Sequence, residues 1–223
     1  MIENSGNIIQ IMFVLVLATA AFIITQRSLV SLVNVYALQS LVLAVTALVL
    51  YLEHGTPSLL WVCLLTLLVK AGIIPYFLRR ILASLPIKRD LEFSYLNPSS
   101  SIVVSALLLF AVYISFSNLT GHLFPDPLFF LGGVIGVSLA LMGMMVIFSR
   151  KKVLSKITGY LTMENGIVLF SLFIAEMPFI IEVLVFIDLL MLITLAAVMA
   201  FGMDSSIEAF HRRLTRLGLR FED

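Results

Sequence analysis

Cysteine and histidine are scarce in this chain of 223 residues. Its one cysteine, Cys63, and its three histidines lie far apart in the sequence. A single cysteine excludes an internal disulfide and a CxxC motif, and it cannot supply the four thiolates that hold most iron–sulfur clusters. No glycine-rich nucleotide-binding loop is present, because Gly132, Gly133 and Gly136 lie inside an apolar run, where glycine predicts close helix packing. We therefore expect no cofactor, no metal and no catalytic centre in this chain.

Charged residues are also few. They make up 12% of the chain, whereas 61% of its residues are apolar. A soluble domain has about 25% charged residues and about 45–50% apolar ones. A helix of about 20 residues crosses a hydrocarbon core of about 30 Å. The sequence contains seven apolar runs near this length, at about 7–26, 29–52, 58–79, 100–120, 127–149, 153–175 and 178–203. It thus predicts an all-α integral membrane protein of about seven transmembrane helices.

The basic residues gather in alternate connections between these runs. Thirteen of the fourteen lie in or beside such connections: Arg27; Arg79, Arg80, Lys88 and Arg89; Arg150, Lys151, Lys152 and Lys156; Arg212, Arg213, Arg216 and Arg220. The other connections carry acidic residues and histidine but neither Lys nor Arg. Because basic connections stay in the cytoplasm, the pattern predicts an outside N-terminus and a cytoplasmic C-terminus. It indicates contact with the lipid bilayer rather than with nucleic acid.

Three ionisable residues lie near the middle of predicted membrane helices: Lys70, Glu164 and Asp188. Each such charge costs roughly 2.5–3.5 kcal/mol on the insertion scale, so it has to face protein or water, form a pair or lose its charge. Intramembrane ionisable groups most often mark an ion pathway. The alternative is a buried lysine–carboxylate clamp that only holds helices together.

The residues that follow Lys70 weaken its helix. Pro75 has no N–H to donate to the carbonyl of Ala71, and Gly72 lowers helix propensity further. We therefore expect the helix to break beside Lys70, where the freed backbone groups can bind water.

Polar and small residues surround Glu164 in the segment GYLTMENG. Thr162 and Asn165 are candidate hydrogen-bonding neighbours of the carboxylate. Gly159 and Gly166 predict close packing against another helix.

A weak internal repeat relates the two ends of the chain. The stretch QRSLVSLVNVYALQSLVL resembles SRKKVLSKITGYLTMENGIVL, with a basic start and a tyrosine shortly before Gln39 in one copy and Glu164 in the other. Each copy precedes a helix that opens with proline and carries Lys70 or Asp188 at mid-depth. Both copies cross the membrane in the same direction, so the pattern predicts a parallel duplication of three helices, one linker helix and three helices.

This plan divides the chain into four parts: a first three-helix unit at 1–79, a cytoplasmic loop with the linker helix at 80–126, a second three-helix unit at 127–203, and a tail at 204–223. In the tail, Ser205 and Glu208 form a capping box ahead of an apolar stripe at helical spacing with arginines around it. The tail is therefore predicted to be an amphipathic helix, either on the cytoplasmic leaflet or docked on a neighbouring subunit.

Three motifs in this order, YALQSLVL, LLVKAGIIPYFLRR and GYLTMENGIVLFSL, resemble the component E family of hydrogenase-4-type, formate hydrogenlyase-like membrane complexes. The helices at 127–203 also resemble the small K subunit of respiratory complex I and its cation/proton antiporter relatives. In that family, a buried Glu in the middle helix and a second acid in the third helix lie on a lateral proton path. Glu164 matches the first acid, and Asp188 matches the second by helix and depth.

The resemblance implies a non-catalytic subunit in the inner membrane of a prokaryotic cell. Its implied partners are antiporter-like subunits, a membrane-anchor subunit, and peripheral [NiFe] hydrogenase-like and iron–sulfur proteins. Redox chemistry there would drive protons or sodium ions past the buried charges of this chain. The expected path residues are those that the motifs and the repeat single out: Glu164, Lys70 and Asp188, supported by Gln39, Thr162, Asn165 and Pro75. A stand-alone secondary transporter or channel and a purely structural scaffold are the alternatives.

Overall fold

The structure is a computed structural model. It describes residues 2–84, 97–120, 127–150, 153–175, 183, 186–190 and 193. The chain divides into two compact units, residues 1–185 and 186–223, and the helices named below belong to the first. No strand occurs in the described ranges. Within the predicted helix at 178–203, the few described residues are helical, and the predicted tail at 204–223 lies outside the described residues.

Most helices begin and end within two residues of the predicted positions, but the first begins five residues earlier and the third ends five residues later than predicted. They are α1 (Ile2–Thr25), α2 (Leu29–His54), α3 (Pro57–Leu65) continued by η1 (Thr66–Ile73) and α4 (Ile74–Ser84), α5 (Pro98–Thr120), α6 (Pro127–Ser149), and α7 (Val153–Phe170) continued by η2 (Ser171–Ala175). The turn between α2 and α3 follows from local chemistry. Gly55 takes the left-handed φ of 69° and donates its N–H to the Tyr51 carbonyl, and Pro57 occupies the first position of the next helix.

Five of the described helices are long and apolar enough to cross a membrane: Gly6–Thr25, Leu29–His54, Pro57–Ala83, Ser99–Asn118 and Pro127–Ser149. This finding supports a multi-pass membrane protein. The number of seven spans, the orientation and the repeat stay predictions.

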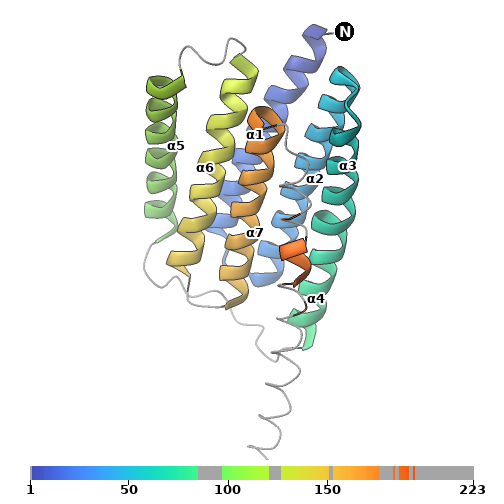
Figure 1. Ribbon diagram of the computed structural model, residues 1–223. Coiled ribbons are helices and arrows are strands. Elements are labelled where there is room, and N and C mark those ends of the chain that lie inside the picture. Colours follow the sequence, from blue (N-terminus) through green and yellow to red (C-terminus); the bar gives the residue numbers. More distant parts are fainter. Residues whose placement is uncertain are drawn as a thin grey trace, which may run out of the picture. The chain divides into compact units, whose positions relative to one another are not determined.

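Helices α1, α2, α6 and α7 pack together, and most of the buried apolar side chains lie among them. In Figure 1, α1 lies behind α6 and α7, α5 flanks α6, and the α3–α4 helix flanks α2. Helix α5 turns large apolar side chains outward: Val103, Leu107 and Phe110 are each about 60% exposed. An exposed apolar face of this kind is unfavourable in water and suits a lipid environment.

Glycines bring α6 and α7 into backbone contact. A Cβ atom on Gly136 would lie 2.6 Å from the backbone nitrogen of Phe170. A Cβ on Gly143 would overlap the backbone of Met163, and one on Gly166 would overlap the backbone of α6. The close packing predicted from the glycines is therefore confirmed, and no larger residue fits these positions unless the helices separate.

Arg150, which directly follows α6, caps the end of α1. The side chain is 2% exposed, and its Nη2 donates to the carbonyls of Ile24 at 2.7 Å and Gln26 at 3.0 Å. The last carbonyls of an α-helix have no N–H partner within the helix, so the guanidinium supplies the donors that they lack. A cation at this end of a helix also complements the helix dipole. Burial lowers the pKa of the Arg150 guanidinium from its ordinary value, but arginine remains charged at any physiological pH.

We expect Arg150→Ala to lower the unfolding midpoint of the purified protein in detergent by several degrees. The substitution removes hydrogen bonds from a charged donor, each worth roughly 1.5–3 kcal/mol. Arg79→Ala is the matched control, because Arg79 is also a basic residue beyond an apolar run but is exposed. Equal midpoints for the two variants would show that Arg150 does not stabilise the bundle.

Candidate functional site

A π-helical segment places Lys70 within the bundle. In η1 the N–H of Ile74 bonds the carbonyl of Val69, five residues back. The proline at position 75 has no N–H, and its ring would crowd the carbonyl four residues earlier in a regular α-helix. The helix nevertheless continues without interruption from Pro57 to Ser84, so the break predicted beside Lys70 takes the form of a π-helical widening. Such segments are frequent at functional sites.

The widened turn directs Lys70 inward. Leu67 and Leu68 are exposed, whereas Thr66 and Lys70 are fully buried. η1 packs on α2, and the contact with Glu164 places the Lys70 side chain against α7.

Lys70 and Glu164 form a buried ion pair. The Lys70 Nζ atom lies 3.2 Å from the Glu164 Oε2 atom, and both side chains have no exposed surface. The two residues come from η1 and α7, which are far apart in the sequence. Both charges lie away from bulk solvent, where a charged group is stable only when it is paired and hydrogen-bonded.

A chain of hydrogen bonds lies beside the pair and connects three helices. The Nδ2 atom of Asn165 donates to Gln39 Oε1 at 3.2 Å and to Ser40 Oγ at 3.1 Å. The Nε2 atom of Gln39 donates to Thr19 Oγ1 at 3.3 Å, and the Thr19 hydroxyl donates to the carbonyl of Val16 at 2.8 Å. These side chains are all buried. The chain therefore fixes α7 against α2 at the depth of Glu164.

The structure brings together some of the predicted site residues and not others. Lys70 and Glu164 meet directly, and Gln39 meets Asn165, the neighbour of Glu164. The hydroxyl of Thr162 donates instead to the carbonyl of Thr158 in its own helix, at 2.8 Å. Pro75 acts on the helix that carries Lys70 rather than on the pair itself.

Asp188 belongs to the second unit. Its side chain is fully buried, and the residues around it from 186 to 190 are helical. Its place on the same path as Glu164 stays a prediction.

Thr19 and Ser40 are site residues that the sequence did not reveal. Each is a small polar residue in an apolar helix, and such residues usually bond a carbonyl of their own helix. Their contact with the amides of Gln39 and Asn165 depends on how α1, α2 and α7 pack.

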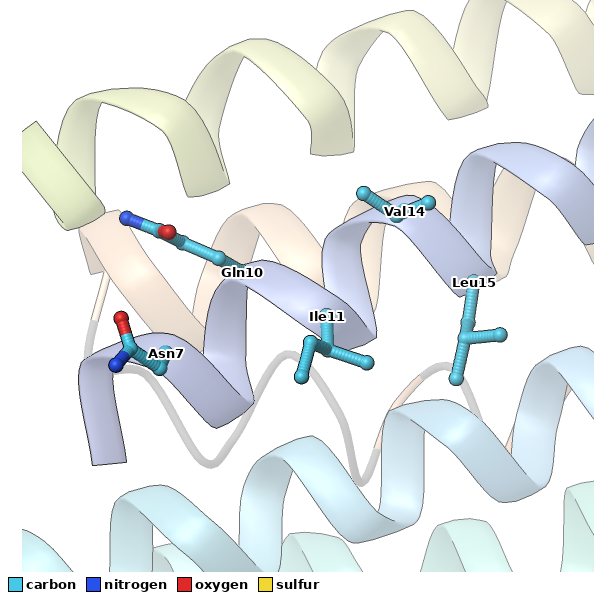
Figure 2. A pocket seen from close by; sticks show the side chains of 5 residues that line it. All are labelled: Asn7, Gln10, Ile11, Val14 and Leu15. Atoms are coloured by element: carbon cyan, nitrogen blue, oxygen red, sulfur yellow. The ribbon is translucent and has the colours of Figure 1, made fainter. Parts of the chain in front are cut away.

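A shallow hollow on the outer face of α1 is a separate feature. Figure 2 shows its lining, Asn7, Gln10, Ile11, Val14 and Leu15, all from one helix. None of these side chains is ionisable, so the hollow lacks the chemistry of the Lys70–Glu164 pair. Within the described ranges, no group of three or more His, Cys, Asp or Glu residues could hold a metal ion.

We found no significant match to this chain among protein-family models, curated proteins or solved structures. The function is therefore argued from the site and from the motifs quoted above.

Proposed function

We propose that this protein is a non-catalytic membrane subunit of a complex I-like, membrane-bound [NiFe] hydrogenase or formate hydrogenlyase-type complex. In this proposal it has seven spans, an outside N-terminus and a cytoplasmic C-terminus in a prokaryotic inner membrane. It contributes Glu164, Lys70 and Asp188 to an ion path that redox chemistry in the partner subunits drives. The observation that carries the proposal is the fully buried Lys70–Glu164 pair beside a π-helical segment.

The pair has the properties that a proton-loading site needs. While Lys70 lies 3.2 Å away, its ammonium stabilises the ionised form of Glu164. When that ammonium moves away or a negative charge approaches, the buried carboxylate gains stability by taking up a proton. The cycle requires only a small movement of the long, flexible lysine side chain.

The same geometry favours a proton over a sodium ion. A sodium ion bound to Glu164 would have to share the carboxylate with the Lys70 ammonium, and the two cations would repel each other. A proton neutralises the carboxylate without occupying a coordination site. We therefore propose H⁺ as the ion that Glu164 exchanges.

A structural scaffold is the second candidate, and one observation favours it. The pair and the amide chain from Asn165 to Thr19 join four helical segments, as a purely mechanical clamp would. A clamp and a proton-loading site differ in what neutral substitutions do. If the pair is a clamp, a protein with a neutral substitution in it fails to assemble. If the pair is a proton-loading site, the same protein assembles but does not pump.

Mild purification tests whether the chain belongs to a complex. We expect the chain, extracted from native membranes in a gentle detergent, to copurify with antiporter-like membrane subunits and with iron–sulfur proteins. Mass spectrometry of the purified material identifies these partners. A chain that purifies alone and moves ions across liposomes without partners would instead be a stand-alone transporter.

A further inference from the structure

One buried face of α7 is polar along the first half of the helix. This face carries four polar side chains at spacings of three, four and three residues, each at most 1% exposed: Ser155, Thr158, Thr162 and Asn165. The bonds of Asn165 to Gln39 and Ser40 show that this face meets α2. It is distinct from the glycine face of α7, which meets α6.

The same face becomes apolar after Asn165. Its next members are Leu169 and Leu172, at most 6% exposed. At this end of the helix, the ring of Phe173 packs on Phe13 from α1 at 5.1 Å and on Phe129 from α6 at 5.9 Å between ring centroids. The polarity of this face therefore changes at the depth of Glu164.

The polar half contains hydrogen-bonding capacity that the described residues do not use. The hydroxyls of Thr158 and Thr162 donate to carbonyls of α7, which leaves their oxygens able to accept. Ser155 Oγ and Asn165 Oδ1 are buried and have no hydrogen-bond partner among the residues that the structure describes. Buried polar atoms are almost always bonded, to protein or to water. These two atoms are therefore candidate binding sites for internal water.

Tyr36 extends this polar surface on the α2 side. It is fully buried and lies three residues before Gln39, so the two share one face of α2. Tyr36 therefore lies on the face of α2 from which Gln39 bonds Asn165 of α7.

We propose that this seam, from Ser155 to Asn165, is a water-accessible half-path connecting the depth of Glu164 with the end of the bundle where α7 begins. Leu169, Leu172 and the three phenylalanines close the opposite end. This inference rests on the proposed role of Glu164 and adds the side from which the carboxylate exchanges its proton. Arg150 and Lys156 lie at the open end, which is the cytoplasmic side under the positive-inside rule.

Cysteine accessibility tests the half-path. In a Cys63→Ser background, Ser155→Cys, Thr158→Cys and Thr162→Cys are introduced singly into the complex in sealed vesicles of known orientation. A small, charged, membrane-impermeant methanethiosulfonate is then added from one side. We expect labelling from the side where α7 begins, fastest at position 155.

Ser138→Cys is the matched control. Ser138 is fully buried and its hydroxyl donates to the Val134 carbonyl, as that of Thr158 does to Leu154, but it lies on α6. Leu169→Cys is a second control, on the apolar half of the same face. Because only a hydrated thiol ionises and reacts, the cysteines of the seam should label roughly tenfold or more faster than those at positions 138 and 169. Equal rates at all positions, or labelling from the opposite side, would overturn the half-path.

Hydrogen–deuterium exchange of the unmodified complex provides a second measurement that does not depend on any variant folding. Amides in 155–163 should exchange faster than those in 166–173, and the reverse order would also overturn the half-path. The outcomes separate the two proposals. If the cysteines of the seam are labelled but the Glu164→Gln variant pumps normally, the role of Glu164 is refuted and the half-path is not. If the cysteines are not labelled but the Glu164→Gln variant has lost pumping, the half-path is refuted and the role of Glu164 is not.

Discussion

Glu164→Gln should abolish redox-driven proton pumping while leaving the complex assembled. Glutamine keeps the shape of the side chain and one acceptor for the Lys70 ammonium, but its amide cannot take up and release a proton as a carboxylate does. The measurement is acidification of sealed vesicles, followed with a pH-sensitive dye, alongside electron transfer in the peripheral subunits with artificial carriers. We expect vesicle acidification to be lost and electron transfer in the peripheral subunits to be retained.

Lys70→Met should have the same phenotype for the complementary reason. Methionine keeps much of the lysine stem but removes the charge that stabilises the ionised carboxylate. Asp188→Asn is expected to follow the same pattern if Asp188 lies on the path. The exposed residue Glu53 provides a matched control, since Glu53→Gln makes the same chemical change as Glu164→Gln away from the pair.

A double substitution distinguishes the ion path from a clamp. Removing one partner of a buried pair leaves an uncompensated charge and costs roughly 3–5 kcal/mol, enough to deplete an assembled complex. If the pair is only a clamp, each single variant pays this cost and fails to assemble, and combining Glu164→Gln with Lys70→Met restores assembly and pumping together. In an ion path the remaining group can face water or lose its charge, so each single variant still assembles. If Glu164 carries the proton, the double variant assembles and still does not pump. Native pumping rates in either single variant would remove that residue from the path.

Gly143→Ala should destabilise the protein, because the added methyl group has no space between α6 and α7. The new Cβ would overlap the backbone nitrogen of Met163 and lie 2.7 Å from the carbonyl oxygen of Gly159. Backbone atoms cannot rotate away as a side chain does, so α6 and α7 have to separate. Overpacking of this kind costs typically about 1–3 kcal/mol, and a rigid backbone contact lies at the upper end.

The measurement is the unfolding midpoint in detergent together with the monodisperse fraction after size-exclusion chromatography. Gly6→Ala is the control, because a Cβ at Gly6 would meet only the side chain of Leu128, at an ordinary contact distance of 3.6 Å. We expect Gly143→Ala to lower both quantities and Gly6→Ala to leave them unchanged. If Gly143→Ala is as stable as the native protein, the helices are less tightly packed than the structure indicates.

The positions of the helices could be predicted from the sequence because their determinants are local. An apolar run of about 20 residues forms a helix wherever it lies, and turn formers such as Gly55 and Pro57 end one helix and begin the next. The predicted range 29–52 and the observed helix Leu29–His54 differ by two residues for this reason. The close packing of glycines could also be predicted, since glycine in an apolar helix has few other uses.

The partners of the polar side chains could not be predicted in this way. Lys70 and Glu164 were recognisable as costly intramembrane charges, but their contact joins residues 94 positions apart in the sequence. From the sequence, Arg150 is only one of the basic residues that predict a cytoplasmic connection. In the structure its guanidinium also donates a hydrogen bond to the Ile24 carbonyl at the end of α1. The helix break expected beside Lys70 is a π-helical turn within a continuous helix, and this turn packs against α2.

The sequence by itself thus determined the class of protein, the limits of its described helices and the residues whose burial demands an explanation. These properties follow from hydropathy, turn chemistry and the cost of charge in an apolar environment, all of which act within a few residues. Only the tertiary structure decided that Lys70 reaches Glu164, that Asn165 and Gln39 join α7 to α2, and that the face of α7 from Ser155 to Leu172 is buried. Those features depend on which faces of the helices meet, and that is set by packing across the whole bundle, where residues distant in the sequence become neighbours.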